Sequence, residues 1–230
     1  AAGPGLFDAE GRALGAQVGQ HQLAFFSPVD ARRDGGCAGR LGQCSAQALQ
    51  GAGSQPSLTW TDLDAIRALP AVRLAAPSLQ RSAQVMGEGQ NWSTTIQGTT
   101  PEFFEIRTWR IARGRFFDED DERLGTKVAV LGNTVVLNLF GPYESPIGQV
   151  VRVGQVPFEV IGVAAPKGQT GFGQDQDDVV LIPARTFRAK LQGGLQQFIA
   201  GGIVVSVTSA AEAASAQAQV EEVLRARHRI

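Results

Sequence analysis

Two strand pairs, each joined by a glycine-containing tight turn, constrain the fold of this chain more than any other feature of its sequence. Residues 79–97 alternate in side-chain character around a turn at 87–90, which predicts a β-hairpin. Residues 150–163 hold two further apolar strands around Gly154-Gln155, a pair suited to a type II′ turn. Because tight turns join neighbouring antiparallel strands, the chain must contain an antiparallel sheet.

Short helical segments separate the strand signals. Thr59, with Asp62 three residues later, predicts a capped helix that ends at Pro70. Thr100 before Pro101 favours another helix N-terminus, with the threonine as its cap. Further strands are predicted at residues 127–131, 179–182 and 203–207, and further helices at 133–140, 184–191 and 210–227. This mixed order of paired strands and intervening helices predicts an α+β fold in two small lobes.

The N-terminal quarter of the chain is poorly patterned. Residues 1–56 are rich in glycine and show little apolar periodicity, so loop structure is expected there, with one short strand near 22–27. The only two cysteines, Cys37 and Cys44, lie in this segment. They are compatible with a disulfide in an oxidising compartment and equally with two unpaired thiols.

Composition excludes some classes of protein. The formal net charge is −1, from 21 basic and 22 acidic side chains, which gives no support for a nucleic-acid partner. No uninterrupted apolar stretch reaches the roughly 18 residues of a membrane span. The sequence starts at Ala1 without an initiator methionine or a signal peptide. We therefore expect a soluble segment excised from a longer protein.

Patterns that carry catalysis or bind metals are not found. His21 and His228 are the only imidazoles, and no G-x-S-x-G motif occurs, so a hydrolase triad is not predicted. Two cysteines and two scattered histidines do not supply the ligands of a structural zinc site. The acidic run at 118–122 lacks the spacing of a calcium loop and is interpreted as solvated carboxylates at a helix start. We expect no enzyme activity, cofactor or metal.

A glycine-rich segment at 167–173 is the remaining candidate for function. Its lysine precedes the glycines, whereas a phosphate-binding P-loop needs the lysine after them, so it is not a nucleotide site. Two interpretations stay open: a mobile loop that presents Phe172 to a partner, or a loop whose phenylalanine packs into its own core.

From residue 57 onward, an ordered series of short motifs resembles the periplasmic core domain of MacB-like ABC transporter permeases, in the MacB/FtsX-like family. No single motif is decisive, and the order and spacing of the whole series carry the resemblance. The series comprises residues 58–66, 98–104, 114–117, 128–132, 139–141, 146–149, 157–163, 167–168, 178–183 and 224–229.

The resemblance implies a discontinuous porter-like α/β lobe with a smaller, mainly-β, sabre-like lobe inserted in it. The porter-like lobe would comprise residues 57–99 and 168–230, and the insert residues 100–167, after the segment 1–56. It also implies a periplasmic location as part of an inner-membrane protein whose membrane helices and ATPase domain lie elsewhere. The full transporter would be a homodimer, and the isolated domain a monomer.

The function that the resemblance implies is mechanical. The domain would transmit ATP-driven conformational change to a MacA-like periplasmic adaptor, in tripartite efflux with a TolC-like outer-membrane channel. Gly171, Phe172 and Gly173 are the residues proposed to contact a partner. Two alternatives stay open: a cargo- or lipoprotein-binding permease ectodomain, and an FtsX-like activator of cell-wall hydrolases. The transported substrate does not follow from the sequence.

Overall fold

A computed structural model describes most of the chain after residue 57. The described residues are 6–7, 13–14, 22–25, 58–142, 144–169, 175–193, 197–207 and 213–228, and before residue 26 the description covers the backbone alone. Cys37 and Cys44, the candidate disulfide, lie outside the described residues. Gly171, Phe172 and Gly173, the candidate partner contact, lie outside them as well.

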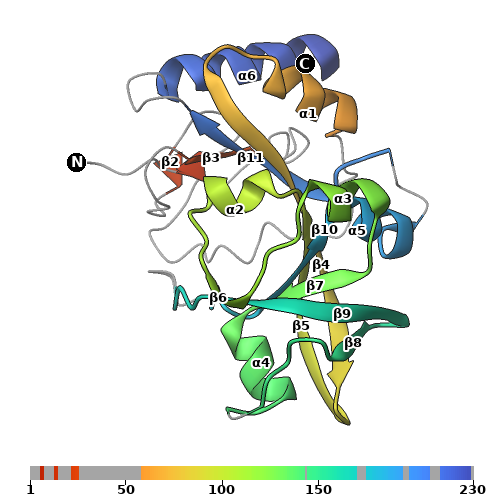
Figure 1. Cartoon of the computed structure of the whole chain (residues 1–230). Coiled ribbons are helices and arrows are strands. Elements are labelled where there is room, and N and C mark those ends of the chain that lie inside the picture. Colours follow the sequence, from red (N-terminus) through yellow and green to blue (C-terminus); the bar gives the residue numbers. More distant parts are fainter. Residues whose placement is uncertain are drawn as a thin grey trace, which may run out of the picture.

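One large mixed sheet dominates the described part of the chain (Figure 1). Its strands are, in spatial order, β3 (Gln22–Phe25), β11 (Gly201–Val207), β4 (Val72–Gly87), β5 (Gln90–Thr99), β10 (Val179–Pro183), β7 (Val128–Leu131), β9 (Val156–Ala164) and β6 (Ile111–Gly114), and β8 (Val150–Val153) pairs with β4 and β9. The pairs β5–β10 and β7–β9 are parallel, and the other pairs are antiparallel. A separate two-stranded sheet joins β1 (Leu6–Phe7) and β2 (Ala13–Leu14).

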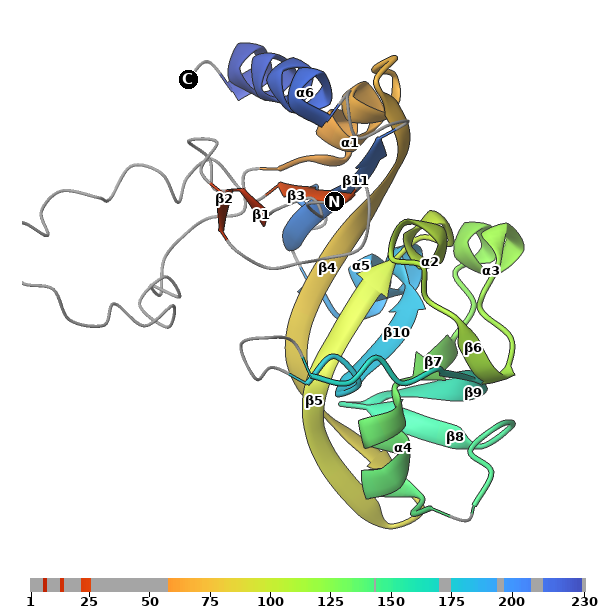
Figure 2. The same cartoon turned by 90° about the vertical axis from the view of Figure 1, so that its left-hand side faces the viewer.

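Strand β4 runs most of the length of the molecule (Figure 2). Its 16 residues pair with β11 through the first half and with β5 through the second half, and β8 joins it near the end. The turn to β5 places Glu88 at φ 46° and Gly89 at φ 81°, the left-handed pair of a type I′-like hairpin. The predicted hairpin is confirmed, and β4 begins several residues before its predicted start.

Helices cover both faces of the sheet. They are α1 (Trp60–Arg67), α2 (Glu102–Ile106), α3 (Glu119–Leu124), α4 (Asn133–Leu139), α5 (Ala184–Lys190) and α6 (Ala213–His228). Adjacent strand residues such as Ala75 and Ala76 fall into different buried clusters, because successive side chains of a strand point to opposite faces. The larger cluster includes side chains of α1, α4, α5 and α6, and the smaller one those of α2. Two-sided burial explains the unbroken apolar runs of β7 and β10.

The two predicted helix starts have different outcomes. Thr59 and Asp62 form a reciprocal capping box at α1, as the sequence indicates. At α2 the cap position falls on Pro101, and the predicted cap, Thr100, makes no hydrogen bond with its hydroxyl. The Thr100 carbonyl instead accepts the N–H of Phe103 at 3.0 Å, and Pro101 has no N–H to satisfy.

The structure is a mixed α/β fold dominated by its sheet. The predicted boundaries of the two lobes stay a prediction, since the sheet continues from β5 and β10 of one into β7 and β9 of the other. Within the described residues, no helix combines the length and the apolar character that crossing a membrane requires.

Candidate functional site

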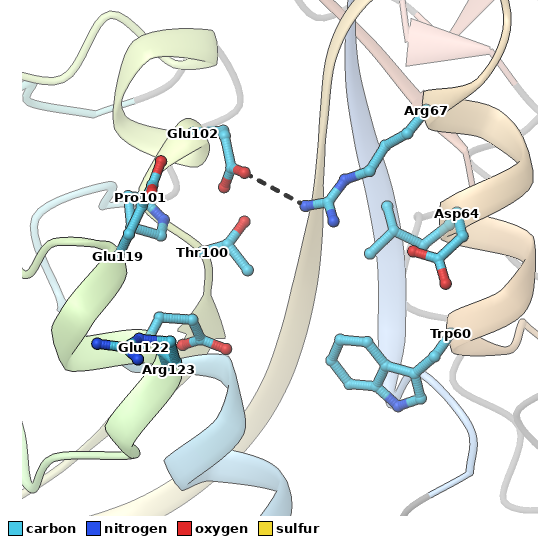
Figure 3. Close-up of a pocket in the computed structure, with 10 residues that line it drawn as sticks. Trp60, Asp64, Arg67, Thr100, Pro101, Glu102, Glu119, Glu122 and Arg123 are labelled. Atoms are coloured by element: carbon cyan, nitrogen blue, oxygen red, sulfur yellow. Dashed lines mark hydrogen bonds and ion pairs between the residues drawn. The ribbon is translucent and has the colours of Figure 1, made fainter.

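A cleft of about 280 Å³ opens between α1 on one side and α2 with α3 on the other (Figure 3). Its lining residues are Trp60, Leu63, Asp64 and Arg67 from α1, Thr100, Pro101 and Glu102 from the start of α2, and Glu119, Glu122 and Arg123 from α3. The cleft thus combines residues that are far apart in the sequence, and charged side chains dominate its walls.

Local capping fixes the helix that carries three of these residues. Asp118 and Asp121 form a capping box at the start of α3, and Gly125 ends the helix at φ 67°. Asp121 is buried and accepts hydrogen bonds from Arg115 at 2.7 Å and from the Thr126 hydroxyl at 2.9 Å. The interpretation of run 118–122 as solvated carboxylates is therefore wrong for Asp121, because this side chain anchors the helix to its surroundings.

A weak ion pair crosses the cleft. Arg67 Nη2 lies 3.5 Å from Glu102 Oε1, and about a third of each side chain is exposed. A long, solvent-exposed pair of this kind contributes little to stability, about 0–1 kcal/mol. Arg123 pairs instead with Asp120, at 2.8 Å on the exposed side of α3. The contact between Arg67 and Glu102 can therefore break at little cost.

Glu122 is the unusual carboxylate of the cleft. Burial raises its pKa to about 6, against the lowering effect of the Arg185 N–H, which donates to Oε1 at 2.9 Å. The nearby charge of Glu102 raises the pKa further. The backbone N–H of Ala184 also acts to lower this pKa, but within the described structure no hydrogen bond forms to the second oxygen, the buried Oε2. Glu122 therefore changes its charge just below neutral pH.

A second polar cluster joins the first helix to the last. Asp62 of α1 is 1% exposed and accepts from Arg227 Nε at 2.6 Å, and His228 Nε2 lies 3.0 Å from its other oxygen. Burial acts to raise the pKa of Asp62, but hydrogen bonds from Thr59 and Arg227 outweigh it and hold the pKa below its ordinary value. The terminal basic residues of α6 are thus tied to the capping box of α1.

The aspartates beside the predicted partner-contact loop have structural partners. Asp177 accepts the N–H groups of Lys167 and Gly168 at 2.7 and 2.9 Å. Asp178 accepts the indole N–H of Trp92 at 2.9 Å. The two Asp177 bonds join the start of the glycine-rich segment to the residues after it, and the Asp178 bond joins the latter to β5.

Sequence reasoning did not identify the cleft. Glu102 falls within one of the motifs that resemble the family, and Glu122 within the acidic run 118–122, but the sequence assigns a binding role to neither of them and none to Arg67. Helix α1 and helix α3 come together only through the sheet, so no local spacing signals their approach. Among the described residues, no group of three or more His, Cys, Asp or Glu side chains is placed to hold a metal ion.

Comparison with known proteins identifies the family. The family model described as the MacB-like periplasmic core domain matches residues 24–223. The chain belongs to this family. The resemblance seen in the sequence is therefore confirmed, and the chain is a MacB-like periplasmic domain of an ABC transporter permease.

Relatives and solved structures agree with this assignment. The macrolide export ATP-binding/permease protein MacB of Rhodospirillum rubrum is 41% identical over 184 residues, which are 80% of this chain and 28% of that protein. The protein of the same name from Azoarcus sp. is 37% identical over 172 residues, 75% of this chain and 26% of the relative. The chain thus spans about a quarter of the length of these relatives.

Two solved structures share the fold. The periplasmic region of MacB from Actinobacillus actinomycetemcomitans matches with a TM-score of 0.66 at 23% identity, over 76% of each chain. The extracellular domain of the ABC-type transporter YknZ from Gram-positive bacteria matches with a TM-score of 0.64 at 19% identity, over 74% of this chain and 84% of that one. The sheet-dominated α/β architecture of this MacB-like domain is therefore that of the two solved domains.

Proposed function

We propose that this MacB-like domain transmits ATP-driven movement from the membrane and ATPase parts of its transporter to a MacA-like periplasmic adaptor. The pump would be tripartite, with a TolC-like outer-membrane channel and a homodimeric transporter. The domain would act mechanically and catalyse no reaction. The observation that carries the proposal is the single strand β4, which extends from the α1 end of the molecule to the β8 end (Figure 2).

The pairing of β4 supports transmission through the sheet. A 16-residue strand has a contour length of about 50 Å. Because β11, β5 and β8 all hydrogen-bond to it, force applied at one end is carried by backbone pairing rather than by loops. The Asp62–Arg227 bond ties α6 to α1 at one end, so movement of either helix engages the other.

The proposed movement is a change in the width of the cleft. We place the porter-like lobe at residues 57–99 and 168–230 and the sabre-like lobe at 100–167, so α1 lies on the first lobe and α2 and α3 on the second. The weak Arg67–Glu102 pair then crosses the boundary between lobes. Hinge or shear movements of packed lobes commonly occur at such a boundary. We propose Gly171, Phe172 and Gly173 as a contact with the adaptor.

The test is to fix the cleft in the full transporter. Cys37 and Cys44 are replaced by serine, and Arg67→Cys and Glu102→Cys are joined by a short bismaleimide linker. We expect the linked transporter to export far less than the unlinked double variant, which is the reference because both lack the Arg67 and Glu102 side chains. The control pair is Asp120→Cys with Arg123→Cys, which links two positions on the same helix, α3. Unchanged export by the transporter linked across the cleft would show that the lobes need not move apart.

One observation favours the cargo-binding alternative. Four large apolar side chains are each at least 39% exposed: Met86 on β4, Leu137 on α4, Ile147 in the segment before β8, and Val150 on β8. Exposed apolar groups at one end of a domain can bind an acyl chain. Binding of a fluorescent fatty acid by the purified domain, abolished by Leu137→Ser with Val150→Ser, would support this second function.

A further inference from the structure

The cleft between α1 and the α2–α3 pair contains buried side-chain oxygens to which no described residue donates a hydrogen bond. The Thr100 hydroxyl belongs to a side chain that is 8% exposed, and its oxygen has no partner in the described structure. Figure 3 shows the Thr100 oxygen on the α2–α3 side of the cleft, directed toward Glu102. One carboxylate oxygen of Glu102 and one of Glu122 are also buried without partners. Unsatisfied buried acceptors cost free energy, so a site that holds three of them favours a donor.

The charge of the lining selects the kind of donor. Four carboxylates, of Asp64, Glu102, Glu119 and Glu122, face two guanidinium groups, of Arg67 and Arg123. Arg123 is already paired with Asp120, which does not line the cleft. The lining side chains therefore carry a net negative charge, which Arg188, over the Trp60 ring at 4.9 Å from its centroid, only partly offsets, and a cationic donor is favoured over a neutral one.

We propose that this cleft binds a single protonated amine or guanidinium group carried on an aliphatic stem. The cationic head would donate to Thr100 and to the free oxygens of Glu102 and Glu122, and the stem would lie against Trp60 and Leu63. A volume of about 280 Å³ lies just below the usual range for small-molecule pockets, which fits a single head group and its stem.

Binding requires side chains of the cleft to rearrange. The three unpartnered oxygens are almost fully covered, so Glu102 must turn from Arg67 toward the ligand, and the atoms that cover Thr100 and Glu122 must move as well. The existing Arg67–Glu102 contact is 3.5 Å long and about a third exposed, so it offers little resistance. The ligand thus replaces a weak ion pair with a better enclosed one.

Affinity should depend on pH through Glu122. Burial raises the pKa of this carboxyl to about 6, Glu102 adds to the rise, and Arg185 of α5 opposes it. The other charged groups that face the cleft are Asp64 and Arg67 of α1, Glu119 and Arg123 of α3, and Arg188 of α5, which lies over the Trp60 ring. Because Glu122 attracts a cation only when it is ionised, we expect affinity to fall about tenfold from about pH 7.5 to about pH 5.

The experiment uses the whole 230-residue chain labelled with ¹⁵N and n-butylammonium or n-butylguanidinium as the probe. NMR shifts are expected at residues 60–67, 100–106 and 119–124 and at the Trp60 indole N–H. Butyramide, which is neutral, should bind at least about tenfold more weakly, because hydrogen bonds to charged groups are the stronger ones.

Variants test which residues bind the cation. Glu122→Gln should weaken binding about tenfold and abolish its pH dependence, and Thr100→Val should weaken it while leaving the pH dependence in place. Glu105→Gln is the matched control, since Glu105 lies on α2 in an exposed pair with Arg73 outside the cleft. Glu105→Gln should bind the probe as the unaltered chain does. Equal binding of butyramide, or an unaltered affinity and pH profile in Glu122→Gln, would overturn the proposal.

A second arm identifies the source of the cation. If it is a lysine or arginine of the adaptor, n-butylammonium should release the adaptor from the immobilised domain, and Glu122→Gln should lower adaptor retention. If it is a small organic amine, the probe should bind while adaptor retention stays unchanged. The binding measurements use the chain alone, so their failure is separate from a failure of the cross-linked transporter.

Discussion

At the scale of single residues, two carboxylates show how the environment sets opposite pKa shifts in one small region. Asp62 receives donors from Thr59 and Arg227, and its pKa lies below the ordinary value. Glu122 receives backbone N–H groups but no side-chain donor that is described, and burial raises its pKa to about 6. The difference lies in the side-chain hydrogen-bond donors, because both side chains are withdrawn from water and only Asp62 receives bonds from Thr59 and Arg227.

We predict that Asp62→Asn lowers the free energy of unfolding by about 2 kcal/mol, because Arg227 and His228 lose a buried anionic partner. The folded-state pKa of Asp62 is depressed, so its contribution is present above the ordinary aspartate pKa and is lost as pH falls below it. Urea unfolding at neutral pH and at about pH 3 measures both effects. Asp64→Asn, an exposed position on the same helix, should change little.

Glu122 should have the opposite effect on stability. Its pKa rises from 4.5 to about 6 on folding, so the folded state binds the proton more tightly and stability falls as pH rises through this interval. The loss amounts to about 1–2 kcal/mol by pH 7. We predict that Glu122→Gln removes this slope and leaves the variant more stable than the parent above about pH 7, as urea unfolding across the pH range would measure. If the free energy of unfolding of Glu122→Gln falls with pH as steeply as that of the parent, the slope comes from other titratable groups.

At the scale of elements, glycines set how closely helices approach the sheet. A Cβ atom at Gly98 of β5 would lie 2.5 Å from Cβ of Phe187 on α5, inside contact distance. At Gly87, at the end of β4, the nearest atom would be Phe140 Cζ at 3.3 Å. The first clash involves an atom fixed to the helix backbone, and the second involves the end of a side chain.

We predict that Gly98→Ala destabilises the domain by about 2 kcal/mol, since α5 must move away from the sheet. Gly87→Ala should cost less than about 1 kcal/mol, because Phe140 can shift and the added methyl group restricts the unfolded chain. Thermal unfolding of the two variants side by side compares the positions. Equal losses would mean that α5 adjusts more easily than the 2.5 Å approach implies.

The same elements show what sequence alone could predict. Hairpin β4–β5, the cap of α1 and the strands β7 and β10 follow from local alternation, capping residues and apolar runs, and all were found. The first half of β4 was missed because residues 72–78 show no clear alternation, with both faces buried. The cleft was missed because it depends on Arg67, Glu102 and Glu122, which only the sheet topology brings together.

At the scale of the whole molecule, we predict that the isolated domain is a monomer at micromolar concentration. The large apolar side chains exposed in the described structure are Met86, Leu124, Leu137, Ile147 and Val150, fewer than a stable dimer interface requires. Dimerisation of the transporter would then depend on its membrane parts. Light scattering on the purified domain tests this, and a concentration-independent dimer would contradict it.

The shared strand β4 also has a thermodynamic consequence. Its first half contributes to the packing under α1 and α6, and its second half to the packing beside β8. One buried cluster includes Ile66 and Val220 at the first end and Val85 and Val153 at the second, so melting of either end exposes apolar surface of the other. Heating should therefore give one calorimetric transition with equal van't Hoff and calorimetric enthalpies, rather than a separate peak for each lobe. Movement of the two ends relative to one another in the native state is compatible with this single melting event.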